Sequence, residues 1–171
     1  MIDYLPLKKI TTLHDDEIKA AVERVIDSGW YLKGEATQRF EEQYASYIGT
    51  RFCVGCGNGL DALTLIFRAY LEMGVLHQGD EIIVPANAYI ASILSITENG
   101  LTPVFVEPRR DTLEIDDMVI EQSINPHVKA ILLVHMYGRC AMSSHITDLC
   151  KQHNLLLIED NAQSVGCVWS E

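Results

Sequence analysis

The stretch LLLIEDNAQSVG begins with four apolar residues, which is typical of a buried strand, and places polar groups directly after them. Glu159 and Asp160 follow the apolar run, and Gln163 comes three residues after Asp160. A buried ionised carboxylate is costly unless it is paired. Asp160 could bind magnesium, act as a base or pair with a cationic ring nitrogen, with Gln163 bonding a ring hydroxyl. It could also be a helix-capping residue beside an incidental amide.

A glycine-rich turn, GCGNGLDAL, lies between an apolar run and a helical pattern. Such turns let an anion, usually a phosphate, approach the N-terminus of a helix, although glycines can also serve turn geometry alone. The spacing is G-x-G-x-G rather than G-x-G-x-x-G, and the next strand ends in Pro85-Ala86 where a ribose-binding acid is expected. No Lys-Ser/Thr follows, so dinucleotide and P-loop sites are disfavoured.

Four further residues have side chains capable of chemistry. Tyr89 follows a strand and could stack on a flat cofactor or belong to the core. His135 ends another strand and could be an acid/base group, an orienting group or a satisfied core histidine. Cys53 and Cys56 form a C-x-x-C without a second pair, which favours small buried core residues over zinc or redox use.

The composition bounds the class of protein. A chain of 171 residues suits one domain or most of one, and its net charge of −11 with no basic run argues against nucleic acid as a partner. The N-terminal residues contain no apolar signal-peptide core, and no apolar run reaches the roughly 18 residues of a membrane span. Five cysteines without a compact framework fit a reducing compartment, so we expect a cytoplasmic protein.

Two regions with different patterns position these residues. Residues 1–50 predict an N-terminal helical segment: residues 1–10 extended, an acid-rich helix start after Thr12, a helix end at Ser28-Gly29, and a second helix ending at Gly49. Residues 51–171 alternate short apolar runs with helical patterns. The five predicted strands are RFCVGC, EIIVPA, PVFVEP, VKAILLVHMYG and LLLIED, and the predicted helices are LDALTLIFRAYLEMG, AYIASILSITENG, residues 116–123 and SSHITDLCKQHN. Continuous apolar strands predict a mainly parallel α/β sheet with helices on both faces.

A phosphate turn, an aromatic residue and an acid follow successive strands in that order, at the edge where such sheets bind ligands. Here the sequence resembles the DegT/DnrJ/EryC1/StrS sugar aminotransferases, which have the aspartate-aminotransferase fold (type I) and use pyridoxal 5′-phosphate (PLP). The matching blocks are SGWYLKGEATQRFEEQYASYIGT, GNGLDAL, GDEIIVPANAYIAS, TPVFVEPRRDTLEID, AILLVHMYG and LLLIEDNAQSVG. The resemblance implies that residues 51–171 are the first part of the PLP-binding large domain, incomplete at its C-terminus and without the small C-terminal domain.

The resemblance also implies roles for particular residues. Backbone N–H groups of Gly59 and Leu60, together with Asn58, hold the cofactor phosphate. Tyr89 stacks on the pyridine ring, whose nitrogen and hydroxyl are bound by the two residues discussed first, Asp160 and Gln163. NGLDAL and the acid in VEP resemble the branch that aminates dTDP-linked 3-keto-6-deoxyhexoses, with glutamate as the expected amino donor and a homodimer as the expected assembly.

One feature departs from the family. In the family, the Schiff-base lysine follows the Asp-x-x-Gln pair. No lysine of this chain lies at a matching position; its lysines are Lys8, Lys9, Lys19, Lys33, Lys129 and Lys151. We therefore expect no catalytic residue in residues 1–171 and an inactive chain when it is alone. Two alternatives remain open: a related PLP-dependent sugar dehydratase, in which histidine replaces that lysine, and a non-catalytic cofactor- or nucleotide-binding domain.

Overall fold

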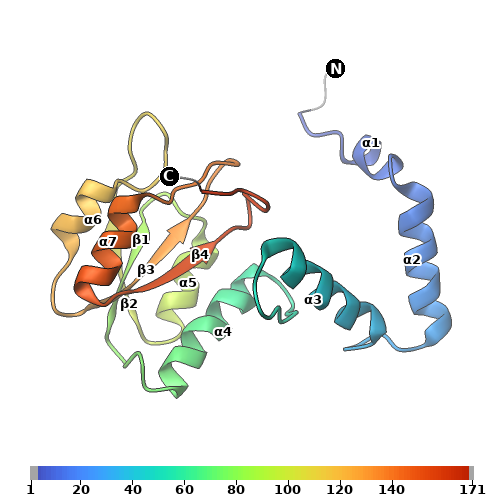
Figure 1. Cartoon of the computed structure of the whole chain (residues 1–171), viewed down its shortest axis with the longest axis horizontal. Helices are drawn as coiled ribbons and strands as arrows, with labels where there is room; N and C mark the ends of the chain where they lie inside the picture. Colours follow the sequence, from blue (N-terminus) through green and yellow to red (C-terminus); the bar gives the residue numbers. More distant parts are fainter. Residues whose placement is uncertain (1–3, 170–171) are drawn as a thin grey trace. The chain divides into compact units, whose positions relative to one another are not determined.

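The computed structural model describes residues 4–169, which divide into two compact units after Gly55 (Figure 1). The N-terminal unit contains the helices α1 (Leu7–Thr12), α2 (Asp15–Ser28) and α3 (Glu35–Ile48). The unit from Cys56 onward contains the sheet. Each unit is described by itself below.

The N-terminal helices follow local sequence signals. Three acidic residues open α2, where they complement the helix dipole, and α2 ends at Gly29 with a positive φ of 63°. Gly49 ends α3 in the same way, with φ 80°. The two predicted helices are therefore confirmed. The extended segment predicted for residues 1–10 is wrong from Leu7 onward, where a short helix follows Pro6 and begins with three good helix formers, Leu7, Lys8 and Lys9. Residues 1–3 lie outside the described residues.

The second unit alternates helices and strands from α4 onward. Its elements are α4 (Gly59–Glu72), β1 (Glu81–Pro85), α5 (Ile90–Thr97), β2 (Thr102–Val106), α6 (Asp117–Ser123), β3 (Val128–Val134), α7 (Ser144–His153) and β4 (Leu156–Asp160). The strands form one sheet in the order β2-β1-β3-β4, and every pairing is parallel. The predicted parallel α/β architecture is confirmed.

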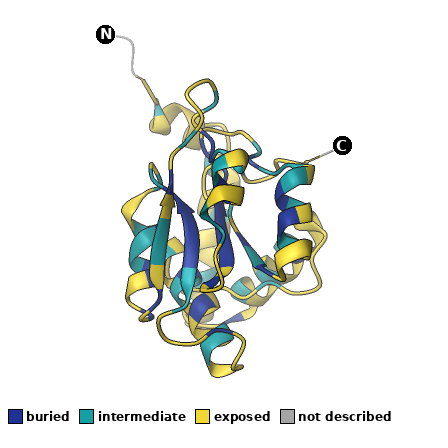
Figure 2. Cartoon of the chain, turned by 90° about the vertical axis from the view of Figure 1, so that its left-hand side faces the viewer, coloured by how far each residue is buried: buried dark blue, intermediate teal, exposed yellow. Residues whose placement is uncertain are grey.

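Helices cover both faces of this sheet, and the two central strands, β1 and β3, are its most buried part (Figure 2). On one face, Phe67 of α4 and Ile96 of α5 pack on Val84 and Leu132. On the other, Ile120 of α6 and Ile146 of α7 belong to a separate cluster of buried residues. Burial from both sides explains why the strands are continuously apolar instead of alternating.

The predicted strand RFCVGC is wrong, so the described residues form a four-stranded sheet rather than a five-stranded one. No described strand pairs with residues 51–56, and their apolar side chains face solvent: Phe52 is 73% and Val54 81% exposed. A strand exists only through ladder hydrogen bonds to a neighbour, so apolar sequence cannot form one alone. The outer edge of β4 likewise has no partner strand among the described residues.

Parallel pairing brings the carboxyl ends of all four strands to one edge of the sheet. The polar residues that follow the strands therefore gather there, on the loops after β1, β3 and β4. No helix among residues 4–169 combines the length and apolar character needed to cross a bilayer.

Candidate cofactor-binding site

Asp160 ends β4 with both carboxylate oxygens held. Oδ2 accepts a hydrogen bond from the hydroxyl of Ser92 in α5 (3.1 Å), and Oδ1 accepts one from the backbone N–H of Ala162 (3.1 Å). Ser92 is fully buried, whereas Asp160 is partly exposed. Turns, not a helix, follow β4, so the helix-capping alternative is wrong. A carboxylate has about four lone-pair positions, so Asp160 can accept a further donor from a ligand.

Gln163 has its amide oriented by the loop after β3. Its Oε1 accepts the backbone N–H of Tyr137 at 2.9 Å, so the NH₂ group remains as the donor end. Tyr137 and Gly138 both have positive φ (56° and 79°), and the N–H of Arg139 bonds the carbonyl of Met136 to close the turn. The sequence-predicted pair, Asp160 and Gln163, thus presents an acceptor and a donor from one short segment.

Glu159 is engaged on the other side of the same strand. Its Oε2 lies 2.8 Å from Nε2 of His135, which is buried at the end of β3. His135 is therefore a core histidine whose ring is hydrogen-bonded, which was one of the three interpretations of the sequence. Two successive carboxylates leave β4 on opposite faces because side chains alternate along a strand.

The N-terminus of α4 is closed by reciprocal hydrogen bonds. Asn58 Oδ1 accepts the N–H of Asp61, and Asn58 Nδ2 donates to Asp61 Oδ2, both at 3.0 Å. Gly59 and Leu60 keep backbone N–H groups with no partner among the described residues. These donors and the positive end of the helix dipole suit an anion such as phosphate. The side chain of Asn58, in contrast, is largely used by the cap.

Tyr89 immediately precedes α5 and is 74% exposed, so it is not a core tyrosine. Two residues before it, Asn87 Nδ2 donates to the carbonyl of Leu113 at 2.9 Å and ties the loop after β1 to the loop after β2. The Tyr89 ring is free to cover a flat ligand at this edge.

Glu114 was missed by sequence reasoning. It is 6% exposed, and its carboxylate accepts the backbone N–H of Met136 (3.3 Å to Oε1). Burial, the largest effect, raises the pKa of the Glu114 carboxyl above its ordinary value. Glu114 sits between Leu113 and Ile115 in an irregular loop without periodicity, so no sequence signal showed that it turns inward.

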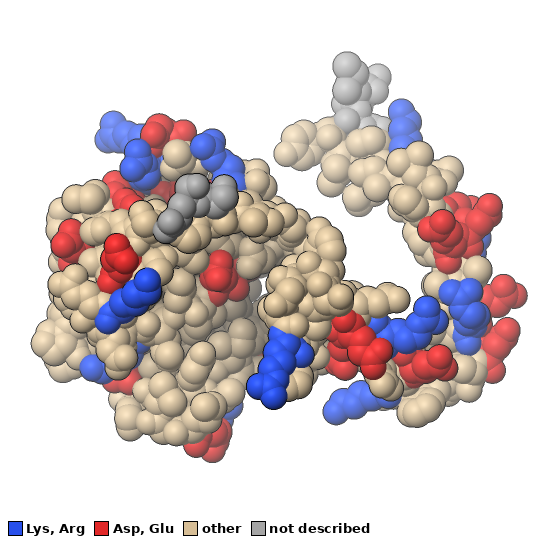
Figure 3. All heavy atoms as spheres, viewed as in Figure 1, with Lys and Arg blue, Asp and Glu red and all other residues tan. Residues whose placement is uncertain are grey.

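The prediction that the C-x-x-C residues are small buried core residues is wrong. Cys53 is half-buried and Cys56 is exposed, so the C-x-x-C does not belong to the core; Cys56 Sγ donates to the carbonyl of Asn58 at 3.4 Å. Acidic and basic side chains are interspersed over the surface seen in Figure 3.

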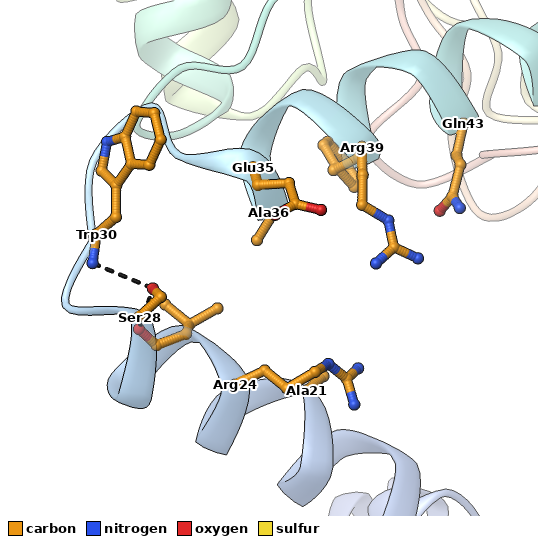
Figure 4. A pocket seen from close by; sticks show the side chains of 10 residues that line it. Ala21, Arg24, Ser28, Trp30, Glu35, Ala36, Arg39 and Gln43 are labelled. Carbon is orange, nitrogen blue, oxygen red and sulfur yellow. Dashed lines mark hydrogen bonds between the residues drawn. The ribbon is translucent and has the colours of Figure 1, made fainter.

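A hollow of about 340 Å³ lies between α2 and α3, within the N-terminal unit (Figure 4). Arg24, Trp30 and Arg39 are among the residues that line it. It contains none of the sequence-predicted site residues, all of which lie in the other unit.

Comparison with known proteins places the chain in a family. Residues 12–171 match the model of the DegT/DnrJ/EryC1/StrS aminotransferase family, and the chain belongs to that family. It is 48% identical over 170 residues to the dTDP-3-amino-3,6-dideoxy-alpha-D-galactopyranose transaminase of Aneurinibacillus thermoaerophilus, covering 99% of this chain and 46% of that relative. The chain thus spans less than half of the relative's length.

Solved structures agree in fold. DesV of S. venezuelae superposes with a TM-score of 0.90 at 40% identity, over 96% of this chain and 43% of DesV. The E. coli GDP-4-keto-6-deoxy-D-mannose-3-dehydratase, solved with hydrated PLP bound, superposes with a TM-score of 0.85 at 29% identity, over 90% of this chain and 40% of that one.

We predict that Glu114→Gln stabilises the fold at neutral pH more than at acid pH. A raised pKa means that the fold favours neutral Glu114, a contribution that is full below the unfolded-state pKa and lost as pH rises through the folded-state pKa. Gln stays neutral, so the variant's gain in free energy of unfolding should grow from about pH 4 to pH 7. Urea unfolding at several pH values measures it, with exposed Glu98→Gln as control; a gain that shrinks as pH rises would contradict the assignment.

We predict that Gly57→Ala and Gly59→Ala differ in stability. A Cβ at Gly57 would lie 2.5 Å from Asp61 Oδ2 and displace that carboxylate from Asn58, whereas a Cβ at Gly59 meets nothing within 4 Å. Both changes reduce unfolded-state entropy alike, so the pair isolates the clash. Gly57→Ala should be less stable than Gly59→Ala by about 1 kcal/mol, one hydrogen bond. Equal urea midpoints and slopes would show that the cap tolerates the methyl group.

Proposed function

We propose that this chain supplies PLP-binding residues of a nucleotide-sugar aminotransferase. The observation that carries the proposal is the pairing of a held acceptor, Asp160, with an oriented donor, Gln163, at the carboxyl edge of the sheet. Family membership and relatives that are dTDP-sugar transaminases support it.

The available groups fit the chemistry of PLP. Its phosphate suits the N–H groups of Gly59 and Leu60, and the face of its ring suits Tyr89. Asp160 would hold the proton of the pyridine nitrogen, and the Gln163 NH₂ group would donate to the ring hydroxyl. When bound, PLP supplies an electron sink for bonds at the amino-bearing carbon. The contribution of Asp160 is to keep a proton on the nitrogen.

The described residues of the unit that carries the candidate site place no lysine at the site edge for transamination. Lys129 donates to the carbonyl of Pro126 (2.7 Å) at the start of β3, opposite the site edge, and Lys151 lies within α7. The remaining lysines of the chain belong to the N-terminal unit. The proposed role of residues 4–169 is therefore to bind and orient the cofactor.

The proposed substrates are a dTDP-linked keto-6-deoxyhexose and glutamate, used by a cytoplasmic homodimer. The names of the dTDP-sugar transaminase relatives support the sugar. Exposed apolar side chains on α2, such as Val22 and Ile26, support a covering partner surface, and five free cysteines fit a reducing compartment. Transaminase relatives are more similar than the dehydratase neighbour, which disfavours the dehydratase alternative.

Asp160→Asn should leave the fold intact and reduce amino transfer by orders of magnitude, because a neutral amide cannot hold the pyridinium proton. The assay is amino-sugar formation from a dTDP-linked keto sugar and glutamate by the natural protein, with circular dichroism as the folding check. Exposed Asp148→Asn on α7 is the matched control. Near-normal turnover in Asp160→Asn would contradict this role. If the wild-type protein instead releases a deoxygenated keto sugar and no amino sugar, the enzyme is a dehydratase.

Tyr89 should contribute through its ring and not its hydroxyl. Tyr89→Phe is expected to bind PLP as wild type does, and Tyr89→Ala to bind it more weakly by about 1–2 kcal/mol, the usual range for aromatic stacking. Fluorescence titration with PLP measures both. The same loss of affinity in the two variants would point to the hydroxyl group instead.

A further inference from the structure

His135 is buried, with 2% of its surface exposed, and each of its hydrogen-bonding groups has a partner. Its backbone N–H donates to the carbonyl of Asp160 (3.1 Å), and its own carbonyl accepts the hydroxyl of Ser164 (2.9 Å). Nδ1 accepts the backbone N–H of Ala141 at 3.0 Å, and Nε2 lies 2.8 Å from Glu159. One buried residue thus connects the end of β4, the turn after β4 and the loop after β3.

These contacts fix the tautomer of the imidazole ring. Nδ1 accepts the N–H of Ala141, so it carries no proton and Nε2 must carry it. The Nε2–H group then donates to the Glu159 carboxylate. The ring acts as an acceptor toward the β3 loop and a donor toward β4, two functions that no single amide side chain can place at both distances.

The segments that His135 connects are the ones that carry the candidate site. Asp160 and Ser164 flank Gln163, and both are bonded by the His135 main chain. Ala141 closes the loop that contains Tyr137, whose N–H orients the Gln163 amide. Loss of the Ala141 contact would loosen the end of this loop, and a looser loop would hold the Tyr137 N–H, and with it the Gln163 amide, less firmly.

We propose that His135 is a positioning residue that holds the Asp160–Gln163 turn in its ligand-binding geometry, through the Nδ1 contact to Ala141 and through its carbonyl contact to Ser164. The proposal rests on the proposed function, since it gives the turn PLP as its ligand. His135 touches no reacting group; it acts through Gln163.

Two substitutions separate the two ring nitrogens. The Asn oxygen in His135→Asn can replace Nδ1 as acceptor for Ala141 but cannot reach Glu159. The longer Gln amide in His135→Gln can reach Glu159 but leaves the Ala141 N–H without its acceptor. Exposed His153→Gln on α7 is the control for a histidine substitution outside the site.

The first measurement needs no cofactor. Amide hydrogen exchange in the natural protein should show faster exchange at Tyr137 and Ala141 in His135→Gln, with near-wild-type protection in His135→Asn and His153→Gln. Equal protection at both amides in the two His135 variants would overturn the proposal. This readout is independent of PLP, so it stands even if the proposed function fails.

The second measurement tests the ligand. His135→Gln should bind PLP at least about tenfold more weakly, which is about 1.4 kcal/mol, and shift the absorbance maximum of the bound cofactor, because its hydroxyl loses an oriented donor. His135→Asn should do neither. Faster exchange with unchanged PLP affinity and absorbance would overturn the link to the cofactor, and a wild-type protein that binds no PLP would refute the proposed function instead.

Should His135→Gln fail to fold, Ser164→Ala takes its place. It removes the hydroxyl that bonds the His135 carbonyl and leaves both ring contacts intact. The same hydroxyl also donates to the carbonyl of Arg139 at 3.4 Å. We expect weakened PLP binding with Ala141 still protected, because the turn after β4 is released while the Nδ1 contact stays in place. PLP binding equal to wild type in Ser164→Ala would count against the positioning role.

Discussion

The register between β3 and β4 is the constraint on which the candidate site depends. Leu133 is paired with Glu159 and Val134 with Asp160, and the N–H of His135 continues the ladder to the carbonyl of Asp160. A slip of one residue would turn every side chain of β4 to the other face. Asp160 would then face the side of His135, and Glu159 would face Ser92. The apolar pattern of β4, buried at Ile158, fixes which register is stable.

The same register explains how two adjacent carboxylates are tolerated at the end of an apolar strand. Each receives a donor from a different layer: Glu159 from the His135 ring and Asp160 from Ser92 on α5. The donors are almost fully buried, but the carboxylates are partly exposed, so neither charge loses all its hydration. The buried groups are the ones that fix geometry, and the charged groups remain available to a ligand or to water.

Periodicity and helix-end signals were sufficient for most of the fold. The strands from EIIVPA onward and the helices between them could be predicted because their patterns are local. RFCVGC could not, since a strand is a property of two segments and its neighbour is not specified by its own residues. Asp160 and Gln163 could be singled out because they are polar residues that follow a strand. The groups that hold them, Ser92 and the Tyr137 N–H, could not. Glu114 lies in a loop with no period, and whether it or Tyr89 points inward depends on packing from distant elements.

The proposed cofactor is anionic, yet the chain has a net charge of −11, and Asp61 lies in the first turn of the helix that would bind its phosphate. The local arrangement of groups at the site, and not the net charge, determines whether an anion can bind. Charges further away than about 8–10 Å are largely screened at physiological ionic strength, so the overall charge matters little at the site. The Asp61 carboxylate is bound by Asn58 and lies next to Gly57, while the N–H groups of Gly59 and Leu60 have no partner among the described residues. The cap thus engages the acidic side chain at the start of the helix and leaves the backbone N–H groups available to the anion.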